Sequence, residues 1–380
     1  MRMLSRMLLV GGIGGLCVFV GIGRADEGFR VPRKEVMEFL KTVAVDPPKK
    51  PAVSPGVVWK AQVTHPSAVA AIRLHFDRKP LGASPAWRLV VRSSTGAAVE
   101  TIERTSPIAA GKEFWTAAVP GSTAKVELTV EGDPNATGLV LDRYAVDTTE
   151  AKQQGTVGPD QKIPIGQANA AIQRWGHPVA RLLIGTQEGA LGYCTGFTLN
   201  DTLVMTNQHC IANADEARIT TVEFGFDANA AQPDRYAVTA LEAVDPSLDF
   251  AIVRTSGSPG TKHGHVTLDP QRAITRDLAL VVVQHPSGLP KMASIADCTV
   301  KAPSLVGVGA RETDFGHGCD TLPGSSGSPI SDSTSGSVVG LHHLGFPPGS
   351  ANPQNQGVRI AEIVTFLNAS AKPIHDELGL

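Results

Sequence analysis

The chain has 380 residues, of which 42% are hydrophobic and 5% aromatic, with 39 glycines and 27 prolines. That length exceeds one ordinary hydrophobic core and predicts two domains, and the many turn-forming residues favour short β-strands. A formal net charge of −2 excludes the strongly basic field with which proteins gather nucleic-acid phosphates. We therefore expect no nucleic-acid partner.

The N-terminus has the pattern of a secretory signal peptide over residues 1–25. Two arginines precede the uncharged apolar run 7–22, and Gly23 and Ala25 supply the small residues of a cleavage site before Asp26. The alternative is a membrane anchor, but a run of about 16 residues is shorter than the ~20 that span a bilayer. We expect a secreted or periplasmic protein with no stable membrane insertion after cleavage.

Residues 26–51 follow as an N-terminal segment and linker. The stretch 32–42 is amphipathic and fits either a short helix or part of a propeptide. The proline-rich stretch 47–51 predicts a stiff connection. A new pattern begins after it.

Residues 52–147 alternate between apolar and polar positions in short runs separated by turns, which predicts a β-sandwich accessory domain. Trp59, Trp87 and Trp115 are expected in its core. The strand-like runs are 57–63, 70–76, 87–91, 114–119, 125–130 and 139–144.

The polar segment 148–161 is a predicted linker, and a second all-β domain is expected over 162–372. Only 361–368, near its end, has a helical pattern. The strand-like segments of this domain are 179–184, 192–199, 203–206, 222–226, 251–253, 278–283, 337–341 and 357–360.

Four cysteines remain once the signal peptide is removed: Cys194, Cys210, Cys298 and Cys319. An even number in an oxidising compartment favours two disulfides, with three possible pairings. Cys194 and Cys210 flank a predicted hairpin, so we pair them with each other and Cys298 with Cys319. The alternatives are free thiols or a metal site, but no CxxC or HExxH spacing is present, and we expect no metal.

Three segments of the second domain carry candidate catalytic chemistry. A hydrophobic strand delivers His209 beside a cysteine, Asp249 stands before an apolar strand, and Ser326 lies in the glycine-flanked turn 319–329. Together they resemble the trypsin/chymotrypsin-like serine peptidases, in particular the bacterial glutamyl-endopeptidase-like branch with its Gly-x-Ser-Gly-Ser-Pro signature. The order His, Asp, Ser matches that family. The resemblance implies a chymotrypsin-like double β-barrel behind the β-sandwich, in an all-β chain.

The resemblance also implies a role for each of these residues. A serine hydroxyl is a weak nucleophile at neutral pH, so His209 takes the proton of Ser326 and returns it to the leaving amine. Asp249 orients the imidazole, and the N–H groups of Gly324 and Ser326 bind the oxyanion. No cofactor is required. The implied activity is that of an exported serine endopeptidase with a catalytic triad and an acyl-enzyme, acting on a protein or peptide substrate.

Several neighbouring residues compete for these roles. Ser325 and Ser328 share the turn with Ser326, but the resemblance places the nucleophile two residues after the first glycine. Asp245 competes with Asp249, but an Asp-Pro pair is typical of a turn. Other histidines lack a matching context and are expected at the surface or in turns: His263, His265, His285 and His317.

The resemblance gives two conflicting indications of substrate preference. Asp320 lies six residues before Ser326, where trypsin-like enzymes keep the carboxylate that attracts Lys or Arg. His342 aligns with the pocket wall, where glutamyl endopeptidases hold a substrate carboxylate, and His343 is its neighbour. Either preference, basic or acidic, fits. The strand that carries these histidines, and Gly345 after it, are expected to pair with an extended substrate.

Two other functions compete with the peptidase. A non-catalytic secreted binding or adhesion protein would use the N-terminal β-domain. An esterase with a nucleophile elbow would need its serine before the aspartate and histidine in the chain, which is the reverse of the order here. The sequence leaves the oligomeric state open.

Overall fold

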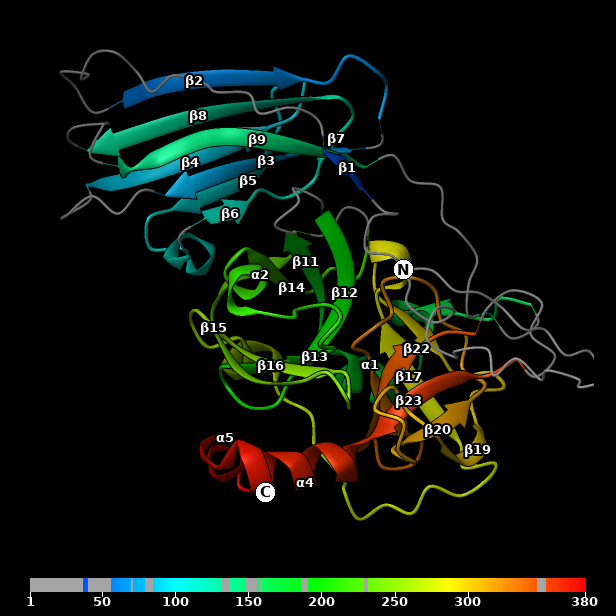
Figure 1. Ribbon diagram of the computed structural model, residues 1–380. Coiled ribbons are helices and arrows are strands. Elements are labelled where there is room, and N and C mark those ends of the chain that lie inside the picture. Colours follow the sequence, from blue (N-terminus) through cyan, green and yellow to red (C-terminus); the bar gives the residue numbers. More distant parts are fainter. Residues whose placement is uncertain are drawn as a thin grey trace, which may run out of the picture.

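The computed structural model describes residues 37–39, 56–69, 71–78, 85–111, 113–131, 137–147, 156, 159–185, 191–228, 232–346 and 353–380. The predicted signal peptide and the proline-rich linker 47–51 lie outside these residues. A β-sandwich packs above a closed β-barrel and an eight-stranded sheet, and the helical C-terminus lies at the opposite end from the sandwich (Figure 1).

The N-terminal part consists of two antiparallel sheets. One has the order β1-β9-β3-β6, with β7 also paired to β3, and the other has the order β2-β8-β4-β5. In β8, alternate residues are buried, as expected of a strand with one face on the core. The core between the sheets includes Leu74, Phe76, Leu89 and Phe114. The strands are β1 (Met37–Phe39), β2 (Gly56–Thr64), β3 (Ala71–Arg78), β4 (Ala86–Arg92), β5 (Ala98–Glu103), β6 (Glu113–Trp115), β7 (Val119–Pro120), β8 (Thr123–Glu131) and β9 (Leu139–Asp147).

Six strands then close into a barrel with the order β11-β12-β13-β16-β15-β14. A barrel leaves no exposed sheet edge, so its strands can be buried along their whole length, as β13 and β14 are. The strands are β11 (Val179–Gly185), β12 (Leu191–Thr198), β13 (Leu203–Thr206), β14 (Thr220–Phe224), β15 (Asp234–Asp245) and β16 (Phe250–Thr255).

A curved eight-stranded sheet forms the second half of this domain, with the order β10-β18-β17-β21-β22-β23-β20-β19. Together the barrel and this half-barrel make the chymotrypsin-like double-barrel architecture behind an N-terminal β-domain, as predicted. The strands are β10 (Ile163–Pro164), β17 (Leu280–Gln284), β18 (Met292–Ser294), β19 (Val300–Leu305), β20 (Asp314–His317), β21 (Pro329–Asp332), β22 (Val338–Leu344) and β23 (Asn355–Arg359).

Helices are short, and most were not predicted. The helix expected over 361–368 is present as α4, and the described residues contain four other α-helices. Asn169 and Asn213 start α1 and α2, because each side chain accepts two N–H groups of the first turn. The helices are α1 (Ala170–Gly176), α2 (Ala214–Arg218), α3 (Pro259–His263), α4 (Ile360–Ser370) and α5 (Lys372–Glu377), with 3₁₀ turns η2 (Pro107–Ala110), η4 (Ile165–Gln167) and η5 (Pro286–Gly288).

Two further expectations require correction. Residues 37–39, inside the stretch predicted as either a short helix or part of a propeptide, form strand β1 and pair with β9, so the helix is wrong at these residues. His285 and His317 were expected at the surface or in turns but have no exposed area, because burial depends on distant partners rather than on local sequence. Within the described ranges, no helix has the length and apolar character required to cross a membrane.

Candidate active site

Strand pairing in the closed barrel brings His209 and Asp249 together. His209 follows β13, Asp249 immediately precedes β16, and the two strands are antiparallel partners with Thr206 opposite Ala251. The Nδ1 atom of His209 lies 2.7 Å from Oδ2 of Asp249, and the backbone N–H of His209 donates to Oδ1 at 2.9 Å. Both carboxylate oxygens therefore hold the same histidine.

The contacts of Asp249 favour its charged form. Burial by itself raises the pKa of this carboxyl, but His209 and His343 outweigh burial and hold the pKa well below its usual range. An ionised carboxylate only accepts hydrogen bonds, so the proton of the neutral His209 ring sits on Nδ1 and leaves Nε2 as a base. Asp249 has a positive φ of 50°, and Asn207 holds its carbonyl at 2.9 Å.

The turn that carries Ser326 has an unusual backbone. Gly324 and Gly327 have φ values of +93° and +86°, which side-chain-bearing residues rarely adopt. A Cβ on Gly327 would lie 2.0 Å from the carbonyl oxygen of Thr195, so glycine is required there. Ser326 is 9% exposed, whereas Ser325 and Ser328 are fully buried.

The hydroxyl groups of the two competing serines are already engaged. Ser325 donates to the side chain of Gln284, and Ser328 donates to the carbonyl of Ser325 at 2.6 Å. Of the three serines in the turn, Ser326 is the one that reaches the surface. The turn thus separates one accessible hydroxyl from two structural ones.

A disulfide and one backbone hydrogen bond bring the Ser326 turn to the histidine. Cys194 is joined to Cys210, the neighbour of His209 in sequence, and the two sulfurs lie within 4.8 Å of a ring nitrogen of His209. The next residue, Thr195, donates its N–H to the carbonyl of Ser326 at 2.8 Å. The second disulfide joins Cys298 to Cys319. Both pairings are those predicted.

The amide groups of the turn divide into two sets. The N–H of Ser325 donates to Leu322 and that of Gly327 to His342, each at 2.9 Å. Among the hydrogen bonds of the described residues, none uses the N–H of Gly324 or of Ser326 as donor. These are the two donors that were expected to bind an oxyanion.

A buried extension of the His209–Asp249 pair was not predicted. Nδ1 of His343 lies 3.3 Å from Oδ2 of Asp249, and its Nε2 lies 2.7 Å from Oδ2 of Asp314 on β20. Burial alone lowers the pKa of His343, but Asp314 and Asp249 outweigh it and raise the pKa to about 9. The result is a chain of alternating acids and imidazoles that runs from Asp314 to His209. The signal in the sequence was the second histidine of the pair, which had been assigned to the substrate pocket.

The two residues that suggested a substrate preference, Asp320 and His342, have different surroundings. Asp320 is 3% exposed, and its Oδ2 accepts the backbone N–H of Gln161 at 2.8 Å, so this carboxylate holds the segment that enters the domain. His342 is also buried, with Nδ1 3.2 Å from Nε2 of His317. Burial lowers the pKa of His342 well below its ordinary value, so its ring is neutral at pH 7. Gly345 is half-buried just after β22.

Comparison with known proteins identifies this part of the chain. Residues 194–341 match the family described as trypsin-like peptidase domain. The match indicates a trypsin-like peptidase domain over these residues. Proteins of this family act on proteins or peptides, and the matched region contains His209, Asp249 and Ser326.

Two curated proteins resemble part of this chain over part of their own length. The secreted RxLR effector protein 73 of Plasmopara viticola is 28% identical over 192 residues, which are 47% of this chain and 47% of that protein. An uncharacterised protein of Sinorhizobium fredii is 27% identical over 168 residues, 40% of this chain and 25% of that protein. The chain thus spans about half or less of the relatives it matches.

Solved structures of proteases also resemble the peptidase. The active form of the Rv3671c protease from M. tuberculosis has 22% identity and a TM-score of 0.43, covering 58% of this chain and 91% of that one. A Glu endopeptidase in complex with MPD has 20% identity and a TM-score of 0.43, covering 57% of this chain and 98% of that one.

Proposed function

We propose that the protein is an exported serine endopeptidase in which Ser326, His209 and Asp249 form the catalytic triad. The observation that carries the proposal is the double contact of Asp249 with His209, at 2.7 Å to the ring and 2.9 Å to the backbone. It fixes the tautomer that a general base needs, with Nε2 unprotonated. The accessible hydroxyl of Ser326 supplies the nucleophile.

The reaction follows from these groups. Oγ of Ser326 bonds to the carbonyl carbon of the scissile peptide as its proton passes to Nε2 of His209. The N–H groups of Gly324 and Ser326 bind the oxyanion, and the C–N bond breaks as the imidazolium protonates the leaving amine. Water then repeats the sequence on the ester. Asp249 stays ionised and stabilises the imidazolium throughout.

An extended substrate fits the edge of β22. Pairing between β21 and β22 ends at Leu341, whereas β22 continues to Leu344, which faces Gln356 of β23 on its other side. The backbone beyond His342 is therefore placed to accept a substrate strand. This edge favours cleavage within a polypeptide over cleavage at its terminus.

The engagement of Asp320 favours an acidic residue before the cut. A carboxylate that already holds the backbone N–H of Gln161 attracts a substrate cation less strongly, which counts against a basic preference. We expect a peptide library, read by mass spectrometry, to show cleavage after Glu or Asp. Cleavage after Lys or Arg would reverse this assignment and restore Asp320 as the pocket acid.

Export is proposed from the signal-like residues 1–25, which lie outside the described ranges. The two disulfides are compatible with an oxidising compartment. N-terminal sequencing of protein recovered outside the cytoplasm is expected to begin at Asp26. Recovery only of reduced protein that starts at Met1 would contradict export.

Peptide hydrolysis by matched variants tests the enzymatic proposal. We expect Ser326→Ala and His209→Ala each to reduce kcat by about 10⁵-fold or more, because residues of a triad act as a unit. Ser335→Ala, at an exposed serine outside the site, should keep wild-type activity. A folded wild-type protein that hydrolyses no peptide of the library would favour the rival function, binding through the N-terminal β-domain.

A further inference from the structure

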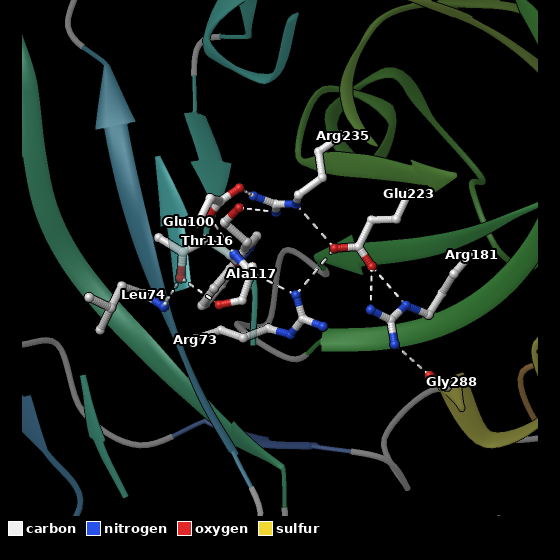
Figure 2. Close-up of polar contacts among 10 residues, drawn as sticks. Arg73, Leu74, Glu100, Thr116, Ala117, Arg181, Glu223, Arg235 and Gly288 are labelled. Carbon is white, nitrogen blue, oxygen red and sulfur yellow. Dashed lines mark hydrogen bonds and ion pairs between the residues drawn. The ribbon is translucent and has the colours of Figure 1, made fainter. Parts of the chain in front are cut away.

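A buried cluster of charges joins the N-terminal β-sandwich to the peptidase. Glu223 on β14 has no exposed area, and three arginines surround its carboxylate: Arg181 at 2.7 Å, Arg235 at 3.1 Å and Arg73 at 3.4 Å (Figure 2). Burial alone favours neutral Glu223, but Arg181, Arg73 and Arg235 outweigh it and hold its pKa well below the usual range. One anion thus contacts cations from both domains.

The sandwich supplies and holds part of this cluster. Arg73 lies on β3, is 1% exposed, and also donates to the carbonyl of Thr116 at 3.1 Å. Arg235 on β15 of the barrel extends into the sandwich, where it contacts Glu100 at 2.5 Å and the carbonyl of Trp115. Apolar packing also crosses between the domains, and it is formed by Trp115, Ala145, Leu183 and Tyr193.

Arg181 connects this cluster to a turn of the second half-barrel. Its Nη1 donates to the carbonyl of Gly288 at 2.6 Å, and its guanidinium lies 3.6 Å from the centre of the Phe226 ring. Gly288 has a φ of +67°, and a Cβ there would lie 2.3 Å from the Tyr193 ring. Arg181 therefore fixes a carbonyl on a turn, η5, that has no room to shift toward the barrel.

The turn fixed by Arg181 directly supports the residues before Ser326. The N–H of Ser287 donates to the carbonyl of Pro323 at 2.5 Å. A Cβ on Gly324 would lie 2.9 Å from the carbonyl of His285 and 3.0 Å from the N–H nitrogens of Ser287 and Gly288. The side chain of Thr195 links the two segments, because it accepts the N–H of His285 and donates to the carbonyl of Gly324. We call residues 320–327 the oxyanion loop.

We propose that Arg181 is a positioning residue for the oxyanion loop, and that the N-terminal β-sandwich keeps Arg181 in place. The sandwich does so in two ways: it supplies Arg73, which contacts Glu223, and it supplies the partners that hold Arg235 against Glu223. The inference rests on the proposed function in one respect, the role of the Gly324 and Ser326 amides. It gives the sandwich a part in catalysis, because the sandwich sets the geometry of the loop through Glu223 and Arg181.

The physical reason lies in the cost of an incomplete buried cluster. Removing one member of this buried network leaves its partners with unmet hydrogen bonds and changes the balance of charge around Glu223, so they rearrange or admit water. Arg181 is the member that also bonds Gly288, so a change at Glu223 reaches η5 through one guanidinium. Loss of one oxyanion donor typically costs about 10²–10³ in kcat, and partial misalignment of the loop costs a fraction of that.

The test uses three variants of the full chain. Arg181→Lys keeps a positive charge for Glu223, but one ammonium cannot also reach the Gly288 carbonyl in the way the planar guanidinium does. Arg73→Met removes the contribution of the sandwich. Arg218→Met is the matched control, because it breaks another contact between the domains. Arg218 lies 3.3 Å from Glu113. This ion pair is partly exposed and is separate from the Glu223 cluster.

Hydrogen–deuterium exchange measures the loop independently of activity. We expect exchange in peptides covering 283–290 and 320–327 to be about tenfold faster in Arg181→Lys and Arg73→Met, an effect that a local opening free energy lower by ~1.4 kcal/mol produces. Exchange in β13 and β16 should be unchanged and reports an intact barrel. In the same variants we expect kcat to fall ~10–100-fold with KM nearly constant. Arg218→Met should match wild type in each measurement.

The outcomes separate the two proposals. Unchanged exchange in 320–327 of Arg181→Lys, with the barrel intact, overturns the positioning role. So does equal acceleration in Arg218→Met, because the effect would then come from general loosening of the interface. A wild-type protein without peptidase activity would refute the proposed function, while the exchange data would still decide whether Arg181 holds the loop.

Discussion

Removing the buried cation between Asp249 and Asp314 should destabilise the peptidase in a pH-dependent way. His343 contacts both carboxylates and has a pKa raised to about 9 from 6.5. At about 1.4 kcal/mol for each tenfold change in proton affinity, that rise corresponds to ~3 kcal/mol of stabilisation. His343→Gln keeps a hydrogen-bonding side chain but removes the charge.

The folded protein binds the His343 proton more tightly than the unfolded chain does. Its stabilisation is therefore complete below about pH 6.5, declines as the pH rises, and is lost once the pH passes about 9. We expect His343→Gln to be less stable than its parent by ~3 kcal/mol near pH 6, with a deficit that shrinks by pH 10. Besides the two aspartates, His342 and His317 lie close to His343. Both histidines are present in the parent and in the variant, so their titration largely cancels when the two proteins are compared at the same pH.

Urea unfolding followed by circular dichroism measures this difference. Both proteins carry Ser326→Ala so that self-cleavage does not interfere. His177→Gln, at an exposed histidine, is the matched control and should not alter the pH dependence. A deficit for His343→Gln that stays constant between pH 6 and pH 10 would refute the reasoning, because the lost contacts would then be unconnected with a proton.

Three further changes test other parts of the site. Gly327→Ala should abolish peptide hydrolysis, since its Cβ would lie 2.0 Å from the Thr195 carbonyl, and a folded variant with wild-type kcat would contradict the strained turn. Asp249→Asn should lower kcat by about 10⁴-fold, because His209 would then take the wrong tautomer. Asp245→Asn should remain active, because the Asp245 carboxylate closes a local turn, where it accepts the N–H of Leu248 at 2.8 Å. Equal losses of activity in the two variants would argue against Asp249 as the acid of the triad. Replacing Cys194 and Cys210 together by alanine should cost about 3 kcal/mol in a denaturation experiment, because the bridge closes a short loop of sequence separation 16, and unchanged stability would count against the bridge.

Regular alternation and local motifs made much of the fold predictable from the sequence. In strands with one buried face, such as β8 and β4, every second residue is buried, so their positions follow from the alternation of apolar and polar residues. The peptidase motifs were recognisable because each carries its own local context. His209 and Asp249 then meet because the strands next to them pair, which is a property of the topology.

Irregular elements escaped sequence analysis for identifiable reasons. Strand β15 has two register irregularities against β16, and its burial pattern does not alternate, so period-two reasoning failed there. Helices α1 and α2 are only 7 and 5 residues long, too short to show a helical period. Their asparagine caps were the remaining signal.

Contacts between distant residues were beyond the reach of sequence patterns. Asp320 was one of two competing candidates for the substrate pocket, and its carboxylate accepts a backbone N–H from Gln161, 159 residues earlier in the chain. The burial of His285 and His317 and the link from His343 to Asp314 likewise depend on which strands become neighbours. Charges at such positions are assigned only once their partners are known.

The catalytic role of Ser326 can be tested by mapping the adduct of a fluorophosphonate probe. We expect a single covalent adduct on the folded protein, located on Ser326 by peptide mass spectrometry, and absent after Ser326→Ala or His209→Ala. An adduct on a different serine, or labelling of Ser326 that persists without His209 at the wild-type rate, would contradict it.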